Sequence, residues 1–161
     1  MNQSQESNFD SNQLEEVLER FQSMLANVDF TAQMQTLDIG RFQFTRRKEA
    51  KRQLTAMYVG LWKLALNSSF PNNADEILDR FLFNTCDVKG KAKRRKAEDF
   101  ALICREYANI LKERGDTNFI NVALLLCQNL GCNDQQSLRR ISLQMALDMR
   151  AMYHHLFDRL I

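Results

Sequence analysis

The sequence predicts an all-α protein, folded as a single bundle of five or six helices with no sheet. Its 161 residues include only one Pro and five Gly, whereas an all-β chain needs a turn residue about every 8–12 positions. Apolar residues instead recur at the i, i+3, i+4, i+7 spacing of a helix face. We expect a flexible polar leader over residues 1–11 and one helical domain over residues 12–161, which is long enough to bury a core.

The first helix is predicted by apolar residues that share one face from position 14 to position 28. Asn12, followed three residues later by Glu15, has the pattern of an N-terminal cap. A weaker segment follows over residues 30–39 and closes at Gly40.

A long helix is expected from about Thr45 to Asn67. It ends before Pro71, because a proline forces the preceding residue out of the helical region. Asn73 and Glu76 form a second capping pattern, ahead of another short helix.

The next two helices are expected over about 93–114 and 117–130. Gly115 is expected to end the first of them in the left-handed conformation, and Gly131 to end the second. Residues 117–130 are apolar on nearly every face, which predicts that this helix lies at the centre of the bundle.

A long C-terminal helix is expected from about Asp134. Its main apolar stripe has a sustained spacing of three and four residues. Leu143, Leu147 and Phe157 lie off that stripe and form a second apolar flank. We therefore treat these three residues as a candidate surface for another protein or for a second copy of the chain.

Charge is distributed unevenly along the chain. Residues 1–40 contain seven acids and one Arg, whereas six cations occur within residues 89–96 alone. Two predicted helices begin with cations, against the usual preference for acids in the first turn. The candidate contacts for an anion or a nucleic acid are Arg46, Arg47, Lys48, Lys51, Arg52, Lys91, Lys93, Arg94, Arg95 and Lys96.

Two alternatives remain for what neutralises residues 41–52 and 89–96. The acidic N-terminal region can fold onto them, or an external anion can bind them. Phe42 and Phe44 lie between cations, where they can stack on bases. The interpretation we favour for these two rings is that they anchor a loop to the core.

Residues 126–141 resemble the turn of a helix-turn-helix, with Gly131 at the turn and Leu138 and Ile141 holding the second helix. The spacing is one residue longer than usual, and an ordinary helix hairpin has the same features. The resemblance implies that four side chains contact bases or phosphates, namely Gln135, Gln136, Arg139 and Arg140.

The sequence offers no convincing catalytic residue, cofactor motif or metal site. His154 and His155 are adjacent, so on a helix they point about 100° apart and cannot share a metal. The four cysteines form no C-x-x-C pair and are expected to be free thiols. No signal peptide or apolar span is visible, and we expect a cytoplasmic protein.

Two functions remain open. The first is a non-enzymatic regulatory or adaptor protein, whose helical surface binds another protein. The alternative is a nucleic-acid-binding protein that uses its basic helix starts, residues 41–52 and 89–96, and the hairpin 126–141.

Overall fold

The computed structural model describes residues 9–112 and 115–160, with the side chain of Asp116 left out. All regular structure in these ranges is helical, as predicted. Seven helices are present, against the five or six expected, because the weak segment 30–39 contains a short helix. In chain order they are α1 (Ser11–Asn27), α2 (Thr31–Thr36), α3 (Phe44–Ser69), α4 (Ala74–Cys86), α5 (Lys91–Ile110), α6 (Asp116–Asn129) and α7 (Gln135–Asp158).

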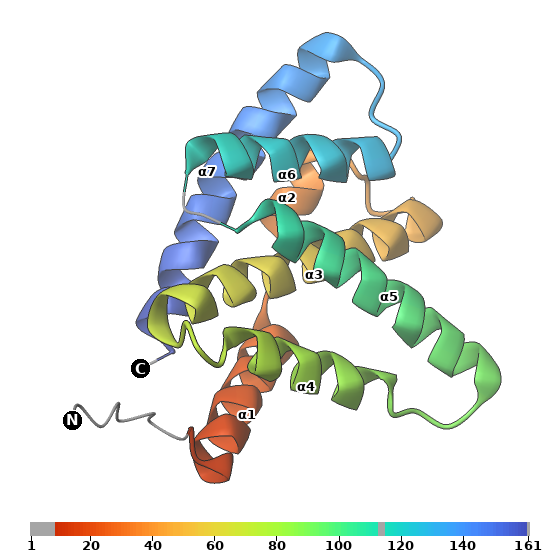
Figure 1. Ribbon diagram of the computed structural model, residues 1–161. Helices are drawn as coiled ribbons and strands as arrows, with labels where there is room; N and C mark the ends of the chain where they lie inside the picture. Colours follow the sequence, from red (N-terminus) through yellow and green to blue (C-terminus); the bar gives the residue numbers. More distant parts are fainter. Residues whose placement is uncertain (1–8, 113–114, 161) are drawn as a thin grey trace.

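The central element is α3, which crosses the molecule between the other helices (Figure 1). Every residue from Ala56 to Leu66 is buried. The prediction that helix 117–130 is central was wrong: α6 packs mainly on α7, and its Leu124 and Leu125 remain half-buried. The apolar face of α6 is wider than the surface that its neighbours cover.

Small residues allow α5 to approach α3 closely. A Cβ atom added at Gly60 would lie 3.1 Å from the Cβ of Tyr107, so only glycine fits this crossing without a shift. A buried polar cluster lies nearby: Gln53 Oε1 accepts hydrogen bonds from the Tyr107 hydroxyl at 2.7 Å and from Asn129 Nδ2 at 3.1 Å. One side chain of α3 therefore joins α5 and α6.

An aromatic cluster attaches α1 to the rest of the fold. The rings of Phe21 and Trp62 are parallel with centroids 3.9 Å apart, and Phe81 of α4 meets both rings edge-on. This cluster holds α1 against α3 and α4 through aromatic packing. Residues 1–8 of the predicted leader lie outside the described residues, whereas Phe9 packs edge-on against Phe70 with centroids 5.1 Å apart.

The helix ends differ in part from the predictions. Asp10 caps α1 in a capping box with Gln13, not Asn12 with Glu15, because the helix begins two residues earlier than the expected cap implies. At Gly131 the positive φ of 71° and the bond from Cys132 N to the Cys127 carbonyl form the expected helix stop.

Gly115 does not end a helix in the left-handed conformation. Its φ is 171°, which is extended, and it precedes α6. The helix before it, α5, already ends at Ile110, and the expected end at residue 114 lies outside the described residues. None of the helices in the described part of the chain is both long and apolar enough to cross a bilayer.

Candidate nucleic-acid interface

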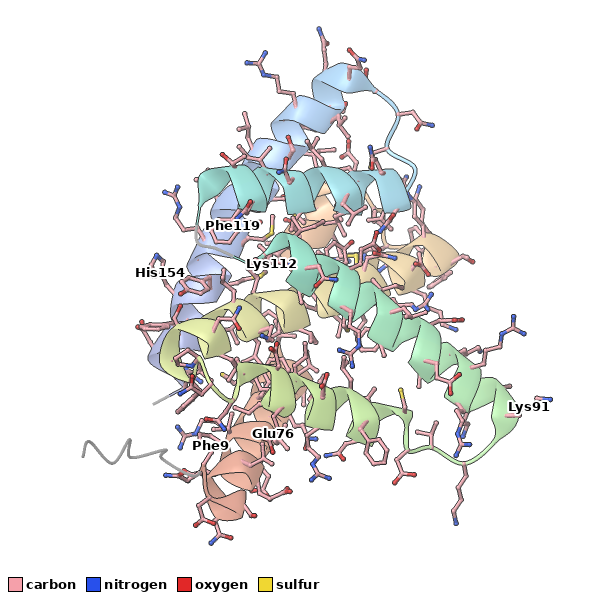
Figure 2. All side chains as sticks on the ribbon, in the orientation of Figure 1. Phe9, Glu76, Lys91, Lys112, Phe119 and His154 are labelled. Atoms are coloured by element: carbon pink, nitrogen blue, oxygen red, sulfur yellow. The ribbon has the colours of Figure 1, made fainter. Side chains whose placement is uncertain are left out.

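The two basic segments lie on the same side of the molecule. Helices α3 and α5 both start at the right of Figure 1 and run toward the centre, where they pack together; Lys91 marks the start of α5 in Figure 2. We call the Lys and Arg side chains of residues 41–52 and 89–96 the basic edge. Arg46, Arg47 and Arg52 are half-buried, and the remaining cations of the basic edge are exposed.

The acidic N-terminal region does not neutralise the basic edge within the described residues. Of the acids on α1, Glu16 pairs with Arg20 of its own helix at 2.7 Å, and Glu15 and Glu19 form no ion pair. Among the described residues, the basic edge contains a single ion pair, between Glu49 and Arg52 at 3.7 Å. The other cations predicted as anion contacts are therefore free to meet an external anion.

The backbone adds to this positive potential. Neither Gln43 before α3 nor Gly90 before α5 forms a side-chain capping bond, and neither first turn contains an acid. The first N–H groups of both helices therefore lack a side-chain acceptor and carry the positive end of the helix dipole.

The phenylalanines between the cations are exposed, so the prediction that they anchor a loop to the core was wrong. Phe42 is 88% exposed and Phe44 74% exposed. A tight turn explains this, since Gln43 N donates to the Gly40 carbonyl and Gly40 N donates to Gln43 Oε1.

The hairpin of residues 126–141 has the exposed polar side chains that the sequence predicted. Asp134 caps α7 by accepting a hydrogen bond from Ser137 N at 3.1 Å, and the four candidate contacts all face solvent. The start of α7 lies at the top of Figure 1, apart from the start of α5. The exposed residues at the start of α7 are Gln135, Gln136, Arg139 and Arg140, whereas the cations of the basic edge lie at the starts of α3 and α5. We treat the hairpin and the basic edge as two candidate surfaces.

The candidate partner surface on α7 is smaller than predicted. Leu143 and Leu147 are 50% and 57% exposed, one turn apart. Phe157 is half-buried and stacks on Tyr153, with ring centroids 6.0 Å apart. Two of the three predicted residues thus remain open to a partner.

The cysteines are free thiols in the described residues, as expected. Burial raises the pKa of both Cys104 and Cys127 to about 12, so these two thiols remain protonated at neutral pH. No group of three or more His, Cys, Asp or Glu residues in the described ranges is arranged to hold a metal ion.

Comparison with known proteins gives no guide to this surface: no family model, curated protein or solved structure matches the chain. Any functional assignment therefore rests on the residues of this chain and their arrangement. The sequence predicted the exposure of the cations correctly, because runs of like charge stay in solvent. The prediction that the two phenylalanines are anchored in the core was wrong.

Proposed function

We propose that this protein binds single-stranded nucleic acid along the basic edge. The observation that carries the proposal is the exposure of Phe42 and Phe44 among cations of which only Arg52 has an acidic partner in the described residues. Exposed rings beside cations are costly for stability and solubility, but they suit a strand whose phosphates and bases alternate.

The two residue types have distinct roles in this proposal. Lys and Arg side chains displace the counterions of the phosphates, which gives affinity without sequence preference. The phenylalanine rings stack on unpaired bases, each stack contributing about 1–3 kcal/mol. In a duplex the faces of the bases are stacked on one another and are not accessible, so the phenylalanine rings favour binding of single strands over duplex.

The test is fluorescence anisotropy with a labelled oligonucleotide of about 16 nucleotides, titrated at several salt concentrations. The logarithm of the affinity should fall with the logarithm of salt by about 0.7 per phosphate contacted. Replacing Lys93, Arg94, Arg95 and Lys96 by Gln should flatten this slope without lowering the melting temperature, because cations at a helix start oppose the dipole.

Matched variants separate charge from stacking. Phe42→Leu with Phe44→Leu should weaken binding at every salt concentration and leave the slope unchanged. Arg94→Gln should flatten the slope, whereas Arg80→Gln, an equal charge change at an exposed position on α4, should not.

Two results would contradict the proposal. One is a complete lack of binding to single strands and duplex at low salt. The other is a slope that responds only to Arg139→Gln with Arg140→Gln, which would assign nucleic-acid binding to the hairpin instead.

A second function, as an adaptor that binds another protein or a second copy of itself, is supported by Leu143 and Leu147. Their exposure on successive turns of α7 leaves an apolar strip without cover in the described residues. Sedimentation velocity at high micromolar concentration tests self-association, which Leu143→Ser with Leu147→Ser should abolish. A monomer of 18.9 kDa under these conditions would exclude the homodimer.

A further inference from the structure

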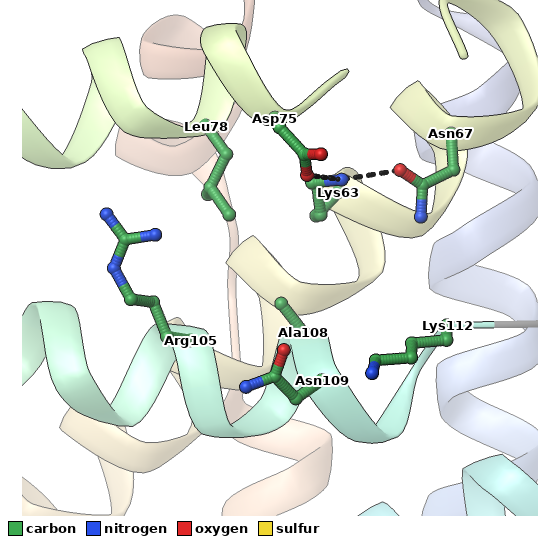
Figure 3. A pocket seen from close by; sticks show the side chains of 8 residues that line it. All are labelled: Lys63, Asn67, Asp75, Leu78, Arg105, Ala108, Asn109 and Lys112. Atoms are coloured by element: carbon green, nitrogen blue, oxygen red, sulfur yellow. Dashed lines mark hydrogen bonds and ion pairs between the residues drawn. The ribbon is translucent and has the colours of Figure 1, made fainter. Parts of the chain in front are cut away.

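A pocket of about 430 Å³ lies between α3, α4 and α5, and none of its lining residues belongs to the basic edge (Figure 3). This volume is within the range of about 300–1,000 Å³ that is typical of small-molecule sites. Its polar lining consists of Lys63, Asn67, Asp75, Arg105, Asn109 and Lys112.

The unusual member of this set is Lys63, a cation on the buried helix α3. Its side chain is only 10% exposed. The ammonium group donates to Asp75 Oδ1 at 2.7 Å and to Asn67 Oδ1 at 2.5 Å. A hydrophobic side chain would fill this position at least as stably, because removing an ion from water is expensive.

Asp75 neutralises Lys63 only in part. The Asp75 side chain is 95% exposed, so water screens its attraction for the ammonium group. The hydrogen bond from Lys63 keeps the pKa of Asp75 below its ordinary value, so the carboxylate is charged at neutral pH. The lining has three cations and one acid, and Asp79 outside the lining pairs with Arg105, so one positive charge is left in excess.

The wall opposite Lys63 is a polar stripe on α5. Arg105 and Asn109 are four residues apart and share one face of α5, with the small Ala108 beside them. Lys112 lines the pocket from the segment that follows the end of α5 at Ile110. Arg105 is held by Asp79 at 2.9 Å. Asn109 and Lys112 form no side-chain hydrogen bond or ion pair in the described residues, and both point toward the pocket in Figure 3.

We propose that this pocket binds a small organic phosphate ester. Its phosphate group would accept hydrogen bonds from the ammonium groups of Lys63 and Lys112 and from the amide of Asn109. Arg105 also lines the pocket, but its guanidinium is held by Asp79 at 2.9 Å and is therefore not one of these donors. The space beyond the charged groups, bounded by Leu78 and Ala108, holds the organic part. This proposal is independent of nucleic-acid binding at the basic edge.

The test is isothermal titration calorimetry with glycerol 3-phosphate as the probe, at constant ionic strength, with glycerol and succinate as comparisons. Saturable binding of one probe per chain is expected, with weaker binding of succinate and none of glycerol. Lys112→Gln should weaken binding about tenfold or more and leave the melting temperature unchanged, because the Lys112 side chain holds no structural contact in the described residues.

Lys63→Met provides the second variant. It removes one partner of the ion pair, but Asp75 is 95% exposed, so the carboxylate left behind is solvated and not buried. It should abolish binding in a protein that melts normally. Arg80→Gln and the fourfold Gln variant of Lys93–Lys96 are controls that should bind the probe like the unaltered protein. An absence of saturation, equal binding of succinate, or equal binding by Lys112→Gln and Lys63→Met would each overturn the proposal.

Discussion

The hydrogen bonds of Gln53 allow a quantitative test of how α3, α5 and α6 are held together. Gln53 is 4% exposed and Tyr107 is fully buried, and the hydroxyl of Tyr107 donates to Gln53 Oε1. Tyr107→Phe removes this donor, but Asn129 still donates to the same oxygen. No buried polar atom of this cluster loses its last partner, so the cost should be about 1 kcal/mol.

Gln53→Met has a different consequence. It leaves the Tyr107 hydroxyl without its acceptor in a fully buried position, while Asn129 is exposed and can bond to water instead. A buried hydroxyl that can no longer donate to its acceptor costs about 1–3 kcal/mol, so this variant should be the less stable of the two. Adding Tyr107→Phe to Gln53→Met removes the orphaned group and should recover part of the loss.

The assay is urea unfolding of the unaltered protein, both single variants and the double variant, analysed as a double-mutant cycle. The m-values should be equal, and the double variant should be more stable than Gln53→Met alone. If the two single costs simply add, the hydroxyl does not depend on Gln53, and the proposed role of this side chain in joining three helices is refuted.

Three further predictions concern the core and the thiols. Leu61→Ala, at a fully buried position of α3, should lower the free energy of unfolding by about 2–5 kcal/mol, measured by urea unfolding. Leu124→Ala, at a half-buried position of α6, should lower it clearly less. Equal losses would show that α6 is as central to the core as α3. Gly60→Ala should destabilise despite a gain in helix propensity of about 1 kcal/mol, because the new Cβ lies 3.1 Å from an α5 side chain, and a rise in melting temperature would show that α5 can move away. Burial raises the pKa of Cys104 and Cys127 to about 12 from 9.0, so the unfolded chain loses these protons first and stability should fall as the pH rises from about 9 toward 12. Urea unfolding at a series of pH values measures this fall, and a flat profile above about pH 9 would contradict the burial of both thiols.

Local sequence patterns predicted the helices well, because apolar spacing and end signals act within a few residues of the chain. Gly131 is a clear case, since its positive φ is a local requirement of the turn. The choice of central helix could not be predicted in the same way. Apolar content in residues 117–130 shows what can be buried, but not how much surface the neighbouring helices provide.

For the candidate sites too, local features could be predicted and features that depend on tertiary packing could not. The exposed cations could be predicted, because runs of like charge stay in water. Their lack of acidic partners within the chain could not be predicted, because it depends on tertiary packing. Phe21 packs on Trp62 and Phe81, so α1 and its acids lie against α3 and α4 and form no ion pair with the basic edge in the described part of the chain. One local signal for the pocket was missed: Lys63 is a lone cation in a run of buried residues on α3.

The central position of α3 has a consequence for how the chain acquires its structure. Synthesis proceeds from the N-terminus, so α3 leaves the ribosome before α5 and α7, the two helices that cover most of it. Until α7 has been made, the apolar side of α3 that it covers remains exposed to water and to other nascent chains. The aromatic cluster shared by α1, α3 and α4 is complete in sequence at Phe81, so these contacts can form before α5 and α7 have been made.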